Sequence, residues 1–184
     1  MTTQISANQI LTAAPAGTWQ LDPVHSSVQF EIDYLGGTFK GEFGEVEAQL
    51  DIHDGTATLS GATQVASVDV KDENLAAHLQ GPDFFDAERY PELRFSADRF
   101  ALDGDAVTVQ GEVTIKGVTH PVAVAGTVVA PITDPHGRER IGLKVATSVD
   151  RTAFGVSWNA ELPAGGQALS NDVAIVADLF FVKA

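Results

Sequence analysis

The chain has 184 residues, of which 44% are hydrophobic, and this length and composition suit one domain with a sizeable core. It contains 11 basic and 25 acidic residues, and the resulting net charge of -14 repels phosphate backbones and anionic lipid surfaces. Nucleic acid is therefore not an expected partner, and the absence of cysteine excludes disulfides, thiol nucleophiles and thiolate metal sites.

The first 16 residues are mostly small and polar, and we expect them to form a flexible arm, or a strand added late, ahead of a folded domain at residues 17–184. They contain neither Lys nor Arg and no apolar run as long as a signal peptide needs. Elsewhere, no segment approaches the roughly 20 apolar residues that span a bilayer as a helix. The sequence therefore predicts a cytoplasmic protein without stable membrane insertion.

Residues 28–34 alternate between apolar and polar side chains, as a strand with one dry face requires. The apolar face consists of Val28, Phe30, Ile32 and Tyr34. Further along, apolar residues occupy odd positions up to Phe43 and even positions from Val46 onward. A bulge or kink at Gly44 would keep both sets pointing inward, as the curvature of a barrel requires.

Residues 72–95 connect two alternating runs and are too rich in aromatic side chains for a solvated linker. Acidic residues begin a short predicted helix, and Gly81 and Pro82 end it. Phe84 and Phe85 follow, and they need a large apolar surface against which to be buried. We therefore expect this element to form a lid over the open end of a sheet or barrel.

Four later segments repeat the alternation with a period of two, and polar turns separate most of the runs. These segments are residues 107–115, 122–128, 141–149 and 173–181. About eight strands with one short helix favour an antiparallel barrel or sandwich over a fold of alternating strand and helix units. The period does not distinguish a barrel with a cavity from a filled sandwich.

Four motifs follow one another along residues 17–184. They supply Trp19, Asp22, His25, Ser26 and Phe30, then His78, Leu79, Phe84, Phe85, Asp86, Tyr90, Pro91 and Phe95, then Gly111, Thr114, Ile115, Gly117, Val118, Thr119 and Pro121, and finally Arg151, Phe154 and Gly155. In this order they resemble the YceI-like family, lipocalin-like barrels that bind polyisoprenoid chains. The chain departs from the family in two places: Leu75 and Ala76 replace an Arg-Asp pair, and Tyr34 replaces a histidine.

The resemblance implies an all-β fold, an antiparallel eight-stranded lipocalin-like barrel with a short helical lid, wide enough for one small ligand. It implies binding, sequestration or transport of a long-chain isoprenoid, either a polyprenyl lipid or an isoprenoid quinone, in an apolar cavity. The implied ligand-binding residues are Phe30, Ile32, Tyr34, Phe39, Phe43, His78, Phe84, Phe85, Phe95, Val113, Ile115, Val124, Leu143, Val145, Phe154 and Trp158. The inward strand positions among them carry no charge, which suits an apolar ligand.

Three polar residues have a structural as well as a functional interpretation. We expect His25 to anchor the first strand through a hydrogen bond to backbone, ahead of a role as ligand or general base. His78 either contacts a polar head group at the barrel mouth or caps neighbouring backbone. Arg151 is expected to pair with Asp150 or with an acidic turn.

Catalytic and cofactor motifs are absent from the sequence. The five histidines form neither H-x-H nor H-E-x-x-H, and there is no G-x-S-x-G elbow, P-loop or dinucleotide fingerprint. We therefore expect no enzyme, no catalytic residue, no metal site and no cofactor. Two alternatives stay open: an enzyme acting on a lipid-like substrate in the same cavity, and a protein-interaction module with a filled barrel. A homodimer is also compatible with the sequence.

Overall fold

The computed structural model describes residues 14–184, so most of the predicted arm at residues 1–16 lies outside the described residues. The start of the described chain is already part of the fold. Ala14 is buried, and the indole nitrogen of Trp19 donates a hydrogen bond to the carbonyl oxygen of Pro15 at 3.3 Å. The predicted arm therefore extends too far by these residues.

The described chain contains eleven strands, one α-helix and two short 3₁₀ helices. In chain order these are β1 (Gly17–Leu21), β2 (Ser27–Tyr34), β3 (Gly37–Phe43), β4 (Val46–His53), β5 (Thr56–Gln64), η1 (Val65–Ser67), β6 (Val68–Asp69), α2 (Glu73–Gln80), β7 (Glu92–Asp103), β8 (Ala106–Ile115), β9 (Val118–Thr133), β10 (Glu139–Asp150), η2 (Arg151–Phe154) and β11 (Leu169–Lys183). The predicted helix in the middle of the chain is confirmed.

Eight of the strands close into an antiparallel barrel. The order of hydrogen-bonded neighbours is β1, β4, β5, β7, β8, β9, β10 and β11, and β1 pairs again with β11, where Trp19 lies opposite Lys183. Strands β2, β3 and β6 continue the sheet from the first part of β11. The predicted antiparallel barrel of eight strands is therefore confirmed, with three further strand segments at one end.

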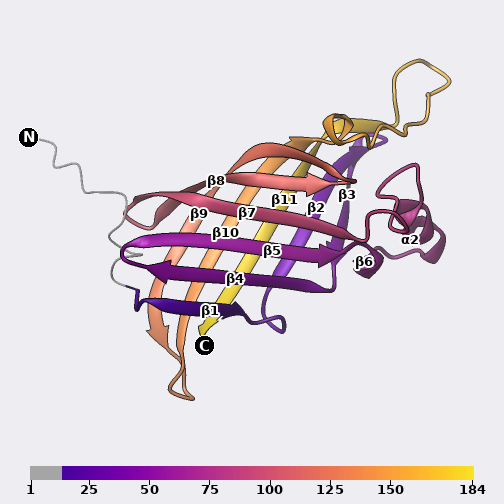
Figure 1. Cartoon of the computed structure of the whole chain (residues 1–184). Coiled ribbons are helices and arrows are strands. Elements are labelled where there is room, and N and C mark those ends of the chain that lie inside the picture. The colour runs from indigo at the N-terminus through magenta and orange to yellow at the C-terminus, as the bar shows by residue number, and fades with distance from the viewer. Residues whose placement is uncertain (1–13) are drawn as a thin grey trace, which may run out of the picture.

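The barrel is built from two crossing sets of strands (Figure 1). Strands β1, β4, β5 and β7 run across the front of the view, and β9, β10 and β11 cross behind them at a steep angle. Helix α2 and strand β6 lie at one end of the front strands, which we call the lid end. The opposite end, where β5 follows β4 and β8 follows β7, is called the far end.

Two irregularities interrupt the strands, a kink at Gly44 and a bulge in β7. Strand β3 ends at Phe43 and β4 begins at Val46, and the amide of Gly44 bonds to the carbonyl of Ser67 at 3.0 Å, which confirms the predicted kink. A register shift between Ala97 and Arg99 in β7 marks a bulge that the sequence did not predict. Both irregularities increase local strand twist and curvature, which a closed barrel needs.

The buried apolar residues form two clusters. The far-end core consists of Ala14, Trp19, Leu50, Ile52, Ala57, Leu59, Ala97, Val107, Val109, Val124, Val128, Ile141, Leu143, Val145, Leu179 and Phe181. The lid cluster consists of Phe30, Phe43, Val68, Leu79, Phe84, Ile115, Phe154 and Val156, with partly buried side chains packed against them. Separate clusters at the two ends mean that the barrel interior is not one uniform core.

Candidate functional site at the lid end

Helix α2 is held at both ends by the residues that its sequence provides. The Asp72 carboxylate accepts a hydrogen bond from the amide of Leu75 at 2.9 Å, and the amide of Gly81 bonds to the carbonyl of His78. Leu79 is its buried residue, while Leu75 and Ala76 pack more loosely against the lid cluster. At the two positions where the family has an Arg-Asp pair, this chain therefore adds apolar contact.

The segment after the helix is folded back by its own backbone. The amides of Phe85, Asp86 and Ala87 bond to the carbonyls of Leu79, Gly81 and Gln80 at 3.0, 2.9 and 2.8 Å. Asp86 has a positive φ of 52°, a conformation that Asp tolerates better than most residues. Residues 72–91, which we call the lid, are therefore an ordered element and not a free loop.

Aromatic rings join the lid to the barrel. Phe84 is buried, and its ring centroid lies 5.4 Å from that of Trp158, on the chain between η2 and β11. The His78 ring meets both of these rings edge-on, at 4.9 and 5.0 Å. Phe85 is partly buried and contacts the ring of Phe43 on β3 at 5.9 Å. Both phenylalanines of the lid thus pack at the barrel end, as the sequence predicted.

The turn between β8 and β9 fastens the lid from outside. The ammonium of Lys116 donates to the carbonyl of Pro82 at 2.7 Å and lies 3.3 Å from the carbonyl of Gly155. A Cβ atom at Gly117 would lie 2.6 Å from Tyr90 Cε1, so this glycine lets the Tyr90 ring approach the turn. Sequence reasoning missed Lys116, because a lysine in a turn resembles any solvated charge.

Arg151 is buried and does not pair as predicted. Its Nε donates to the carbonyl of Ser170, and its Nη1 donates to the carbonyls of Val156 and Trp158, each at 2.8 Å. Asp150 instead caps η2 by accepting from the amide of Thr152 at 2.9 Å. Burial lowers the pKa of the Arg151 guanidinium, which Asp150 partly counteracts. The expected ion pair was wrong, because the guanidinium holds the backbone around Trp158 in place.

The two clusters differ in how completely their side chains are buried. Four of the largest fully buried side chains, Trp19, Ile52, Val109 and Phe181, belong to the far-end core, and the lid cluster contains none of them. Inward side chains at the lid end are instead only partly buried, and they include Phe39, Val46, Val113, Val149 and Val173. The lid cluster is therefore the less completely buried of the two.

The predicted ligand-binding residues separate into three groups. Ten lie in the lid cluster or against its rings, and these are Phe30, Phe39, Phe43, His78, Phe84, Phe85, Val113, Ile115, Phe154 and Trp158. Four lie in or against the far-end core, and these are Phe95, Val124, Leu143 and Val145. Ile32 is buried outside both clusters, whereas Tyr34, predicted to face inward, is 45% exposed at the end of β2. The structure thus brings together the first group alone.

Several residues of the lid cluster were not among the predicted ones. Val149, Leu169 and Val173 pack against it from β10 and β11, and Leu93 does so from β7. The valines belonged to recognised alternating runs, but period two marks an inward side chain without telling which end of the barrel it faces.

His25 and His78 each pair with a carboxylate. His25 Nδ1 lies 2.8 Å from Asp22 Oδ2, so the predicted hydrogen bond of this ring to backbone was wrong and its partner is a carboxylate. Arg140 Nη1 also bonds to Asp22 at 2.8 Å, and this ion pair lowers the Asp22 pKa most strongly. His78 Nε2 lies 3.3 Å from Asp83 Oδ2. Within residues 14–184, no cluster of metal-ligating side chains occurs.

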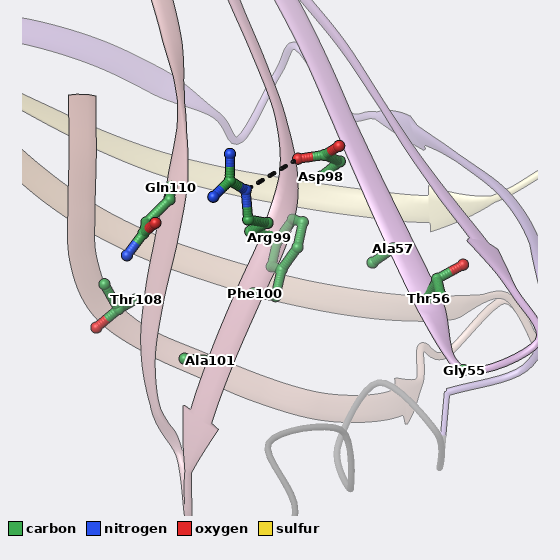
Figure 2. A pocket seen from close by; sticks show the side chains of 9 residues that line it. All are labelled: Gly55, Thr56, Ala57, Asp98, Arg99, Phe100, Ala101, Thr108 and Gln110. Carbon is green, nitrogen blue, oxygen red and sulfur yellow. Dashed lines mark ion pairs between the residues drawn. The ribbon is translucent and has the colours of Figure 1, made fainter. Parts of the chain in front are cut away.

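Two pockets lie on the outer surface, away from the lid. One, of about 370 Å³, is lined by Gly55, Thr56, Ala57, Asp98, Arg99, Phe100, Ala101, Thr108 and Gln110, and Figure 2 shows the exposed Asp98–Arg99 ion pair beside it. The second, of about 770 Å³, extends from the same bulge across β8 to β9. Neither is lined by a predicted ligand-binding residue.

Comparison with known proteins identifies the family. A YceI-like domain model matches residues 19–181, which is most of the chain. This chain belongs to the YceI-like family. Among curated relatives, the UPF0312 protein SERP2314 of Staphylococcus epidermidis is 31% identical over 171 residues, which cover 89% of this chain and 96% of the relative. Protein YceI of Escherichia coli O157:H7 is 26% identical over 151 residues, which cover 78% of each chain.

Solved structures of YceI-like barrels share the fold. Burkholderia cenocepacia BcnA superposes with a TM-score of 0.75 at 24% identity, covering 87% of this chain and 98% of BcnA. A polyisoprenoid-binding domain from Saccharophagus degradans, implicated in plant cell wall breakdown, superposes with a TM-score of 0.66 at 14% identity, covering 92% of this chain and all of that domain. At these identities the likeness shows the fold. Among the described helices, none is long and apolar enough to cross a membrane.

Proposed function

We propose that residues 17–184 form one lipid-binding domain, which binds a single long-chain isoprenoid and sequesters or carries it. The observation that carries this proposal is the partly buried apolar surface of the lid cluster, behind an aromatic lid, in a barrel whose far end is packed. The polyisoprenoid-binding domain from Saccharophagus degradans, which shares the fold, supports the ligand class. The proposed ligand is a polyprenyl lipid or an isoprenoid quinone.

The packed far end limits how much of the ligand enters. Each buried CH₂ contributes about 0.8 kcal/mol, so complete burial of a long polyprenyl tail would exceed the affinity ceiling of non-covalent binding. The ordering of the tail and its partial exposure offset much of this gain. We therefore place the first isoprene units in the lid cluster and leave the rest of the tail outside the far-end core.

Binding, not catalysis, is the activity that this site supports best. The His78 ring is in edge-on contact with the rings of both Phe84 and Trp158, and its Nε2 lies 3.3 Å from Asp83 Oδ2. This arrangement suits a hydrogen bond to a carbonyl or hydroxyl group of the ligand. The cytoplasmic location predicted from the sequence stays a prediction.

Tryptophan fluorescence tests the location of the ligand. The chain has two tryptophans, Trp158 in the lid cluster and Trp19 in the far-end core. Because quinones quench indole emission at short range, a prenyl-tailed quinone should quench the wild-type protein saturably. The matched variant Trp158→Phe, in which Trp19 alone emits, should show little quenching at the same occupancy. Equal quenching of both proteins would place the ligand elsewhere, and no quenching of either would refute quinone binding.

A further inference from the structure

Part of the rim at the lid end contains almost no charged residues of its own, although the ammonium of Lys116 lies 3.3 Å from the carbonyl of Gly155 within it. Two segments form this uncharged rim: residues 34–39 at the β2–β3 turn, and residues 152–171 between η2 and the start of β11. Charged residues make up 20% of the chain, but Glu161 is the single one in these two segments. The amide of Leu35 bonds to the carbonyl of Ala168 at 3.1 Å, so the segments lie side by side. Figure 1 shows the loop before β11 projecting beyond the strands.

The uncharged rim exposes apolar side chains and continues into the lid cluster. Tyr34 is 45% exposed and Leu35 is 58% exposed. From the same two segments, Phe39, Trp158 and Leu169 pack against the lid cluster. The exposed apolar surface of the rim therefore lies next to the proposed ligand site.

Leu35 has a backbone conformation that does not suit leucine. Its φ is 50°, followed by Gly36 at 82°, the left-handed pair of a two-residue hairpin turn that Asn, Asp and Gly prefer. Among the described residues, the other non-glycine positions with positive φ are two aspartates and Lys116, whose ammonium holds the lid. Leu35 is exposed, so packing within the chain does not account for its side chain.

We propose that the uncharged rim docks on the surface of a neutral lipid bilayer, with Tyr34 and Leu35 at the head-group level, so that an isoprenoid passes between membrane and barrel. This inference rests on the proposed function, because a polyprenyl chain resides in bilayers. A tyrosine beside a leucine suits the membrane interface, where one part of the side chain is apolar and the other hydrated. The net charge of -14 opposes anionic lipid, so the matching partner is a zwitterionic surface.

A second exposed apolar group lies at the far end and provides a control. Val129, Ile132 and Phe180 are 53%, 57% and 41% exposed. Through β10, Val129 and Phe180 lie in one cross-strand row on either side of Gly142. This group lies next to the ion pairs of Arg140 with Asp22 and Asp134, away from the lid cluster. A variant in this group therefore tests whether any exposed apolar residue is sufficient for binding to the bilayer.

Flotation with phosphatidylcholine vesicles tests the proposal. Wild-type protein should float with the vesicles, and Leu35→Asn should lower the partition coefficient roughly ten-fold, as expected when one leucine no longer transfers into the interface. Because Asn suits the left-handed conformation, the variant should keep or raise the thermal midpoint. Its affinity for a water-dispersed decyl quinone should equal that of wild type. Ile132→Asn should float like wild type.

Other outcomes separate the two proposals. Phosphatidylglycerol vesicles should bind less protein at low salt, and added salt should reduce this difference by screening the charge repulsion. If Leu35→Asn floats like wild type, or if Ile132→Asn loses binding instead, the uncharged rim is not the docking surface. A wild-type protein that binds decyl quinone but floats with neither vesicle keeps its proposed function and refutes docking. Flotation without quinone binding refutes the proposed quinone site and the passage of a quinone between membrane and barrel, while the docking surface stands.

Discussion

Phe84 and Phe85 are neighbours in sequence but have different surroundings. Phe84 is buried in contact with both His78 and Trp158, whereas Phe85 keeps accessible surface beside Phe43. Phe84→Ala should therefore loosen the lid and cost up to about 3 to 5 kcal/mol of stability. Phe85→Ala should cost less stability and weaken quinone binding more strongly. Thermal midpoint and quinone Kd, measured for each variant, distinguish the two roles.

A matched variant at the far end completes this comparison. Val109 is fully buried in the far-end core, so Val109→Ala should lower the thermal midpoint and leave the quinone Kd of the folded protein unchanged. Val113 is less suitable, because it packs against the lid cluster itself. If Phe85→Ala destabilises the fold without a specific loss of affinity, Phe85 is an ordinary core residue.

Lys116 provides a second prediction for a single residue. Lys116→Met keeps the aliphatic stem but removes the ammonium that donates to the carbonyls of Pro82 and Gly155. An exposed hydrogen bond of this kind contributes about 1 kcal/mol to the free energy of unfolding. Amide hydrogen exchange in the lid should accelerate, and a bound quinone should dissociate faster, with a small change in thermal midpoint. Unchanged exchange across the lid would show that the aromatic contacts alone hold it.

Ion pairs between elements fasten the far end of the barrel. Arg140 on β10 bonds to Asp22, which follows β1, and to Asp134, which follows β9, each at 2.8 Å. Hydrogen bonds from Arg140 are the main cause of the lowered pKa of both carboxyls, and burial opposes this shift. The same contacts raise the pKa of Arg140. This network joins the β1–β2 turn to the β9–β10 turn.

These ion pairs predict a dependence of stability on pH. Because the folded-state pKa of each carboxyl lies below its ordinary value of 3.8, the ionised form is favoured by folding, and the stabilisation is complete above that value. It is lost as pH falls below 3.8 toward the folded-state pKa. Arg140→Met should therefore have a lower thermal midpoint than wild type at neutral pH, and the difference should shrink in acid. A difference that is constant across this range would contradict the electrostatic explanation.

Sequence patterns predict some elements well and miss others for physical reasons. Helix α2 was predictable, because Asp72 and Gly81 act locally at its ends. The kink at Gly44 was predictable from the change in parity. Strand β5, with the sequence TATLSGATQ, was not identified by its own pattern, because small and hydroxyl side chains give little contrast between the two faces. Its pairing with β4 and β7 makes it a strand.

At the scale of the whole molecule, the sequence pattern did not predict that the buried apolar side chains divide into two clusters, one at each end of the barrel. Val113 and Leu143 alternate in the same way, but one packs at the lid and the other in the far-end core. Burial of Arg151 was equally hidden, because its partners are carbonyl groups brought together by the fold. Family resemblance predicted the barrel and the lid, and the structure separates the buried apolar side chains into two clusters.

The separation of the lid cluster from the far-end core predicts how ligand affinity depends on the length of the prenyl tail. If the first isoprene units occupy the lid cluster and the far-end core stays packed, Kd should fall as units are added to a short-tailed quinone and then stay constant. Longer tails add surface outside the barrel, where burial contributes little. A titration series with increasing prenyl length measures this. A steady fall in Kd over the whole series would mean that the far-end core opens to admit the tail.

Native mass spectrometry followed by organic extraction tests the central claim most directly. The account predicts that the purified protein, or the protein after incubation with an isoprenoid quinone, carries one apolar lipid per barrel, and that the extract contains a compound with an isoprenoid tail. A bare protein mass both before and after incubation would contradict the account and indicate a barrel filled by its own side chains. Conversion of the added lipid into another compound would instead show an enzyme.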